Sequence, residues 1–150
     1  MPLGPIGRPM EILLVEDSLM AARLSMGALA NSGIEHRLTW MNSGQEASDF
    51  LNQKGKYARA PVPDLILLDL SLPEIDGRTL LRSIRESPTL KGIPVVIMTG
   101  TAGEQDAAEF DKLDVQGFLL KPIDLEKFLQ LVEQLKDYWK KDMIVNPNPL

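Results

Sequence analysis

The stretch 65–69 (LILLD) is one of four apolar runs of strand length in this chain, and each run ends on a polar side chain. The others are residues 12–17 (ILLVED), 95–99 (VVIMT) and 117–121 (GFLLK). In an open parallel sheet, the carboxyl ends of the strands form the crevice in which ligands bind. We therefore predict one site at this edge that holds three carboxylates, a hydroxyl and an ammonium group. Its residues are Glu16, Asp17, Asp69, Thr99 and Lys121.

Helical patterns alternate with these apolar runs. A further strand is predicted over residues 35–41, and the five expected helices are one that Ser18 caps and those over residues 45–52, 78–86, 103–113 and 124–140. In the first helix the apolar residues that recur at helical spacing are Ala21, Leu24, Ala28 and Leu29. Five strands alternating with five helices predict an α/β fold, in which helices cover both faces of a parallel sheet.

Composition narrows the possible functions. The chain of 150 residues is long enough for one domain with a real core, and its net charge of −5 argues against non-specific binding of polyanions. There is no cysteine and His36 is the single histidine, so thiolate sites and histidine-rich metal sites are excluded. No apolar run reaches the ~18 residues that a membrane span needs.

The ends of the chain are expected to lie outside the domain. Residues 1–9 contain three prolines and no apolar core of a signal peptide, so we expect a flexible N-terminal arm and a cytoplasmic protein. The domain itself is predicted over residues 10–141, and residues 142–150 are predicted to form an irregular tail. Too few residues follow Lys136 for a DNA-binding or enzymatic output domain, so the output is expected to be protein contact, without direct contact to nucleic acid or membrane.

The predicted acidic site has a chemistry of its own. Three carboxylates this close repel one another unless a cation shares them, and with oxygen ligands alone the natural partner is a hard divalent cation, best Mg²⁺. An aspartate can attack phosphorus and carry an acyl phosphate, and Asp69 is the best candidate because it ends what should be a central strand. Lys121 could pair with a carboxylate at rest and with a phosphoryl oxygen later, and Thr99 could donate a hydrogen bond to the same oxygen.

These residues resemble the receiver domain of bacterial response regulators, the CheY-like fold. The likeness rests on the five site residues, on Pro122 after the lysine, and on residues 69–77 (DLSLPEIDG), which are similar to the phosphoacceptor loop of that family. It spans residues 10 to about 136. The resemblance implies a flavodoxin-like (βα)5 fold, a doubly wound parallel sheet with strand order 2-1-3-4-5.

The resemblance also implies roles for single residues. Asp69 would accept a phosphoryl group from a sensor histidine kinase, while Thr99 and Lys121 hold the phosphoryl oxygens. The implied Mg²⁺ ligands are Asp17, Asp69 and the backbone carbonyl of Ser71, with Glu16 in support. Phe118 occupies the position of the aromatic residue that, together with Thr99, switches conformation in the family.

Finer features resemble the single-domain regulators paired with bacterial phytochromes. They are residues 55–57 (GKY), 60–70 (APVPDLILLDL), 87–90 (SPTL), 93–96 (IPVV) and 138–139 (YW), together with a proline-containing tail. This second likeness implies a phytochrome-type histidine kinase as partner. It also implies a homodimer, for which Tyr138, Trp139 and residues 143–145 offer apolar groups near the C-terminus.

Two other functions remain open at this point. A haloacid-dehalogenase-type phosphatase also uses an aspartate nucleophile, but it needs a second aspartate two positions later, where this chain has Ser71. A receiver-like interaction module that takes no phosphate would not need the complete five-residue site. We therefore expect a phosphoacceptor that assists its own phosphorylation and slow dephosphorylation, rather than an enzyme.

Overall fold

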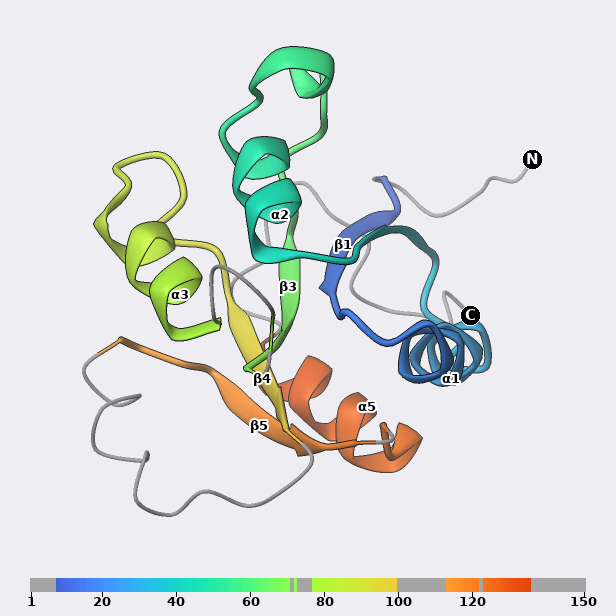
Figure 1. Ribbon diagram of the computed structural model, residues 1–150. Coiled ribbons are helices and arrows are strands. Elements are labelled where there is room, and N and C mark those ends of the chain that lie inside the picture. Colours follow the sequence, from blue (N-terminus) through green and yellow to red (C-terminus); the bar gives the residue numbers. More distant parts are fainter. Residues whose placement is uncertain (1–7, 71, 73–76, 100–112, 122, 136–150) are drawn as a thin grey trace.

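The protein contains a five-stranded parallel sheet in the order β2-β1-β3-β4-β5 (Figure 1). The structure is a computed structural model, and it describes residues 8–70, 72, 77–99, 113–121 and 123–135. The strands are β1 (Met10–Val15), β2 (His36–Met41), β3 (Leu65–Asp69), β4 (Val95–Thr99) and β5 (Gly117–Leu120). The predicted fold class and strand order are confirmed.

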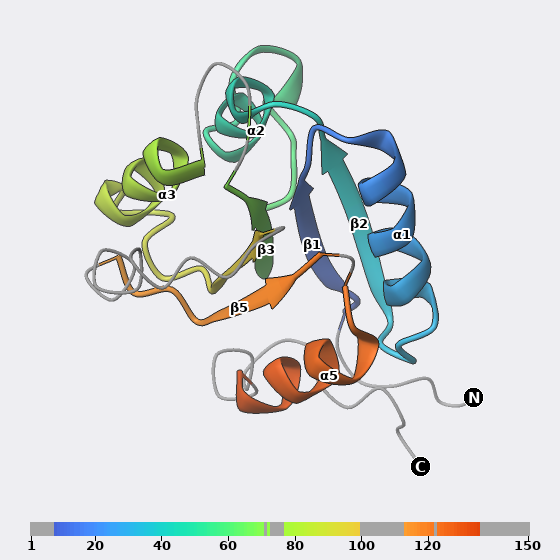
Figure 2. The same cartoon turned by 60° about the horizontal axis from the view of Figure 1, so that its bottom comes forward.

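Among the described residues, two pairs of helices cover the two faces of this sheet. The helices are α1 (Leu19–Ala30), α2 (Gly44–Leu51), α3 (Gly77–Glu86) and α5 (Leu125–Gln134), with a short 3-10 helix, η1 (Gly55–Tyr57), after α2. Helices α1 and α5 lie on one face, and α2 and α3 lie on the other (Figure 2). The doubly wound arrangement places every described connection from a strand to the next helix at the carboxyl edge of the sheet.

The core consists of two layers that share the central strands. Leu14 and Leu67 pack toward α1 and α5, whereas Leu13 and Ile66 pack toward α2 and α3. Alternate side chains of a strand point to opposite faces, and both faces here are covered. This is why the strands read as continuous apolar runs in the sequence instead of alternating with polar residues.

Helix α1 presents only part of the expected face to the core: Leu29 is buried as the apolar spacing indicated, but Leu24 is not. The structure buries Ala22, Ser25 and Leu29, while Leu24 is 52% exposed. Small side chains let a helix approach a sheet closely, so Ala22 and Ser25 are suited to the contact although one of them is polar. The expectation that Leu24 belongs to the inner stripe is therefore wrong.

Several predictions fall on residues that the structure does not describe. They concern residues 1–7 of the N-terminal arm, Ser71, residues 103–112 of the predicted fourth helix, Pro122, and residues 136–150 with Tyr138 and Trp139. The domain boundaries at 10 and 141 likewise stay a prediction. At the N-terminal side, Arg8 forms an ion pair of 2.6 Å with Asp64, whose carboxylate also accepts a hydrogen bond from the backbone N–H of Glu11 at 2.8 Å. Among the described residues, the helices are all too short or too polar to cross a membrane.

Candidate functional site

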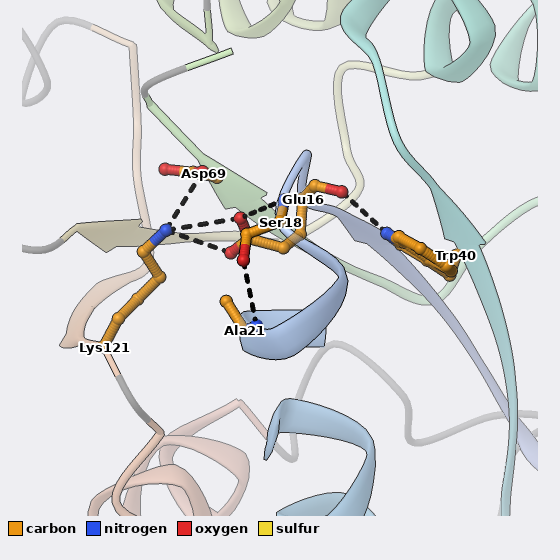
Figure 3. A network of polar contacts seen from close by, with 6 residues as sticks. All are labelled: Glu16, Ser18, Ala21, Trp40, Asp69 and Lys121. Carbon is orange, nitrogen blue, oxygen red and sulfur yellow. Dashed lines mark hydrogen bonds and ion pairs between the residues drawn. The ribbon is translucent and has the colours of Figure 1, made fainter. Parts of the chain in front are cut away.

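Lys121 joins the ends of two strands, β1 and β3, that are adjacent to each other but not to its own strand. It follows β5, and its Nζ lies 3.1 Å from Glu16 Oε1, after β1, and 3.1 Å from Asp69 Oδ2, at the end of β3 (Figure 3). Glu16 is fully buried and Asp69 is 1% exposed. A cation that bridges two buried carboxylates offsets their mutual repulsion, so the three strand ends form one charged cluster as the sequence predicted.

The protonation of this cluster reflects burial and pairing. Burial is the largest influence on Glu16 and raises the pKa of its carboxyl group; the backbone N–H of Ser18 and the amine of Lys121 lower it in part, and the charge of Asp69 raises it further. Burial acts to lower the pKa of Lys121, but its hydrogen bonds to Glu16 and Asp69, with their negative charge, outweigh this effect and raise that pKa. Lys121 is therefore held as a cation at neutral pH.

Three carboxylates come together beside this lysine. Ligand oxygens of Glu16, Asp17 and Asp69 all lie within 4.8 Å of one another, and Asp17 is the exposed member of the group. The donors are hard oxygens, and one of them faces solvent, from which a hydrated ion could enter. This donor set fits a hard divalent cation that keeps part of its water shell.

Thr99 and Lys121 are brought side by side by the sheet. Thr99 ends β4 opposite Leu120 of β5, and the backbone N–H of Lys121 donates to the carbonyl of Thr99 at 2.9 Å. Phe118, the predicted switch aromatic, lies on β5 and is 50% exposed. Of the predicted site residues, Ser71 is the one that lies outside the described part of the chain.

Gly77 fixes the backbone at Asp69 and was not singled out as a site residue from the sequence. A Cβ atom at position 77 would lie 2.6 Å from the carbonyl oxygen of Asp69 and 2.7 Å from Cα of Leu70. The backbone N–H of Gly77 also donates to the carbonyl of Leu70 at 3.2 Å. Residue 77 must therefore be glycine for α3 to begin directly against the end of β3. Residues 69–77 resembled the phosphoacceptor loop, but nothing in this run indicated the contact.

Two further residues form hydrogen bonds with Glu16, one with its carboxylate and one with its backbone carbonyl. Ser18 caps α1 by accepting a hydrogen bond from Ala21 N at 3.1 Å, and its own backbone N–H donates to Glu16 Oε2 at 3.1 Å. Trp40 donates from its indole N–H to the backbone carbonyl of Glu16 at 2.7 Å (Figure 3). The capping role of Ser18 was predictable from its place before a helix, whereas no motif pointed to Trp40.

Comparison with known proteins gives one consistent family. The model of the response regulator receiver domain matches residues 12–133. Response regulator Rcp1 of Synechocystis sp. is 41% identical over 131 residues, which cover 87% of this chain and 89% of that protein. The solved structure of the phosphorylated cyanobacterial phytochrome response regulator RcpA is 40% identical, with a TM-score of 0.74 over 89% of this chain and 96% of that one. The Mn²⁺-bound form of Rcp1 is 39% identical, with a TM-score of 0.73 over 92% and 99% of the two chains.

These matches support a response regulator similar to those of phytochromes, and they give no support to a phosphatase or to an interaction module without phosphate. Proteins of this family are phosphoacceptors rather than enzymes, and they work with histidine kinases and downstream partners in two-component signalling. With the matched region running from β1 into α5 and the charged cluster inside it, the chain belongs to the response regulator receiver domain family.

Proposed function

We propose that Asp69 accepts a phosphoryl group from a sensor histidine kinase in the presence of Mg²⁺. The observation that carries this proposal is the position of Asp69, with a ligand oxygen within 4.8 Å of those of Glu16 and Asp17 and Oδ2 at 3.1 Å from the amine of Lys121. Glu16 is less suited to the role. It is fully buried, and its two carboxylate oxygens already accept hydrogen bonds from Lys121 and Ser18.

In the proposed transfer, a carboxylate oxygen of Asp69 forms a bond to phosphorus while the bond from phosphorus to the imidazole nitrogen of the kinase histidine breaks. The product is an aspartyl phosphate, and the imidazole leaves with the electron pair of the broken bond. The amine of Lys121 moves from the Asp69 carboxylate to a phosphoryl oxygen, and the hydroxyl of Thr99 donates to the same group. Bound Mg²⁺ would neutralise part of the charge on the transferring oxygens.

The proposed metal ligands are Asp17, Asp69 and the backbone carbonyl of Ser71, with Glu16 in support. The chemistry of the three carboxylates favours a hard cation, and a relative has been solved with Mn²⁺ bound. Thr99 and Phe118 are the proposed switch pair, because they lie on the adjacent strands β4 and β5, which end at the charged cluster, and Phe118 is half exposed.

The likeness to phytochrome response regulators supports a phytochrome-type kinase as the phosphodonor. On the same ground we propose that two copies of the chain associate as a homodimer. The downstream partner would be reached through protein contact, in the cytoplasm.

The experiment is a labelling assay with Mg²⁺ and a small radioactive phosphodonor such as acetyl phosphate. The parent chain should take up one phosphate that is released by base, and Asp69→Asn should take up none, because an amide is not an anionic nucleophile. Asp49→Asn is the matched control. The Asp49 carboxylate accepts a hydrogen bond from Gln45 on α2, away from the cluster, so labelling of this variant should be unchanged. Full labelling of Asp69→Asn would refute the assignment.

A further inference from the structure

Trp40 reaches the acidic cluster from the neighbouring strand. The side chain leaves β2, and its indole N–H donates to the carbonyl oxygen of Glu16 at 2.7 Å (Figure 3). The regular pairing of β1 with β2 ends at Val15 and Met41, followed by one more backbone bond from the N–H of Glu16 to the carbonyl of Met41 at 3.0 Å. The indole therefore extends the hydrogen bonding between the two strands by one peptide, to the peptide that joins Glu16 to Asp17.

Asp17 has little else to orient it. Its side chain is exposed and has no hydrogen bond or ion pair within the part of the chain that the structure describes. Its direction is therefore set by the two peptides on either side of it. Trp40 holds the carbonyl of the preceding peptide, and Glu16 Oε2 holds the N–H of the following one, that of Ser18, at 3.1 Å.

We propose that Trp40 is a positioning residue for the divalent cation site. Its indole N–H holds the peptide between Glu16 and Asp17 in the orientation that brings the Asp17 carboxylate next to those of Glu16 and Asp69. The inference rests on the proposed metal binding by these three residues. It adds a residue that contacts neither the metal nor the phosphoryl group and acts through the backbone of a ligand.

The packing of the Trp40 ring allows the contribution of its hydrogen bond to be tested separately. The ring packs against the core cluster on the face of α1 and α5, so its place does not depend on the hydrogen bond alone. Phenylalanine would keep most of this packing and remove only the donor. A typical hydrogen bond contributes about 0.5–1.5 kcal/mol net, which corresponds to about a twofold to tenfold change in an equilibrium constant.

The experiment measures the dissociation constant of Mg²⁺ by isothermal titration calorimetry for the parent chain and for Trp40→Phe. We expect the Kd to rise about twofold to tenfold. Tyr57→Phe is the matched control, because it also removes one hydrogen-bond donor from an aromatic side chain. The Tyr57 hydroxyl donates to Glu46 and to the sulfur of Met41, outside the cluster. Its Kd should equal that of the parent. Equal Mg²⁺ affinity in Trp40→Phe and the parent would overturn the proposal.

A second measurement needs no change at position 40. The sequence contains two tryptophans, so Trp139→Phe leaves a single indole N–H signal in a proton–nitrogen NMR spectrum. This signal should shift as Mg²⁺ is added, with the same Kd as the calorimetric titration, because the ligand peptide accepts its hydrogen bond. A signal that stays in place up to saturating Mg²⁺ would overturn the proposal even if Trp40→Phe failed to fold.

The experiments can reject the role of Trp40 without rejecting the proposed function, and the proposed function without rejecting the role of Trp40. In the labelling assay, Trp40→Phe should need more Mg²⁺ for half-maximal labelling, yet reach close to the parent rate at saturating Mg²⁺. If the parent chain bound Mg²⁺ but took no label, the phosphoacceptor proposal would fail while the two Kd values still decided the role of Trp40. If labelling succeeded and the Kd values were equal, only the role of Trp40 would be lost.

Discussion

Two cationic side chains hold opposite ends of the sheet, and they do so with different partners. Lys121, at the carboxyl end of β5, pairs with two ionisable carboxylates, those of Glu16 and Asp69. Arg85, near the end of α3, lies at the opposite edge, where it joins the segments that lead into β4 and β5. Helix α3 spans the distance between them, because it begins with Gly77 against Asp69 and reaches Arg85 in its last turn.

Within the part of the chain that the structure describes, Arg85 donates to neutral oxygens. Its guanidinium donates five hydrogen bonds of 2.7–3.0 Å, to the carbonyls of Lys91, Ile93, Leu113 and Asp114 and to the side-chain carbonyl of Gln116. A guanidinium has five N–H groups, so the described acceptors match its full capacity. Gln116 continues the network, because the same oxygen accepts from the backbone N–H of Val95 at 2.7 Å.

This comparison distinguishes the cluster around Lys121, whose partners can be exchanged, from the cluster around Arg85, whose partners are fixed. In the proposed function, the carboxylates around Lys121 also bind a metal ion and the amine also binds a phosphoryl oxygen, so each partner of the cluster would have an alternative. The carbonyls around Arg85 have no charge for an ion to compete for, and a carbonyl oxygen does not titrate at ordinary pH. We therefore expect the Lys121 end to respond to metal, phosphate and pH, and the Arg85 end to contribute stability under all of these conditions.

The largest expected effect concerns Arg85. Arg85→Ala should lower the free energy of unfolding by about 4 kcal/mol, because several partly buried carbonyls lose a charged donor at once. Arg85→Lys keeps the charge but has three donors without the planar fork, so it should recover only about half of the loss. Urea unfolding measures both, and Mg²⁺ affinity of the folded variants should equal that of the parent. A changed Mg²⁺ affinity would show that the two ends are coupled.

A smaller effect, of a different kind, is expected for Lys121→Met. Without metal, the variant should lose about 2 kcal/mol of stability, because two buried carboxylates lose their cation. Its Mg²⁺ affinity should rise, since the amine no longer competes for the same oxygens, and saturating Mg²⁺ should restore much of the lost stability. Lys127→Met, at an exposed position of α5, is the control and should change neither value. Unchanged or weaker Mg²⁺ binding by Lys121→Met would contradict the expectation that Mg²⁺ and the Lys121 amine compete for the same carboxylate oxygens.

The sequence allowed the Lys121 cluster to be predicted because its parts lie at ends of strands. Parallel strands must bring their carboxyl ends to one edge, so Glu16, Asp69 and Lys121 could be placed together without knowledge of any contact. The strand order followed from the resemblance to receivers. The inner face of α1 could not be read correctly, because apolar spacing ranks Leu24 above Ser25, whereas close packing on the sheet favours the smaller side chain.

Arg85 and Trp40 gave no such signal. Both donate hydrogen bonds to backbone carbonyls. Because every residue has a backbone carbonyl, the type of the accepting residue does not indicate the contact. The distances along the chain are also long: 28 residues separate Arg85 from Leu113, and 24 separate Trp40 from Glu16. Hydrogen bonds of this kind become visible only when the fold has placed the donor beside a particular peptide.

The smallest expected effect is the pH dependence at the Lys121 end. The pKa of Glu16 is raised above its ordinary value of 4.5, chiefly by burial, so the native state binds this proton more tightly than the unfolded chain does. Its contribution to stability is therefore complete below pH 4.5 and is lost as the pH rises through the native pKa. The pKa of Lys121 is raised from 10.5, so its contribution is lost only above that pH, and Glu16 alone of this pair acts between pH 5 and 8.

Urea unfolding from pH 4 to pH 8 with a chelator tests this directly. The parent chain should lose stability relative to Glu16→Gln as the pH rises, with a slope of at most about 1.4 kcal/mol per pH unit, because a single proton is involved. Saturating Mg²⁺ should flatten the difference, since a cation stabilises the ionised carboxylate. Arg85→Lys should keep the pH profile of the parent at lower stability, because the carbonyl oxygens that Arg85 contacts do not titrate. A parent and a Glu16→Gln variant with parallel profiles would mean that the buried carboxylate is not the source of the pH response. The contrast between the two ends of the sheet would then rest on metal binding alone.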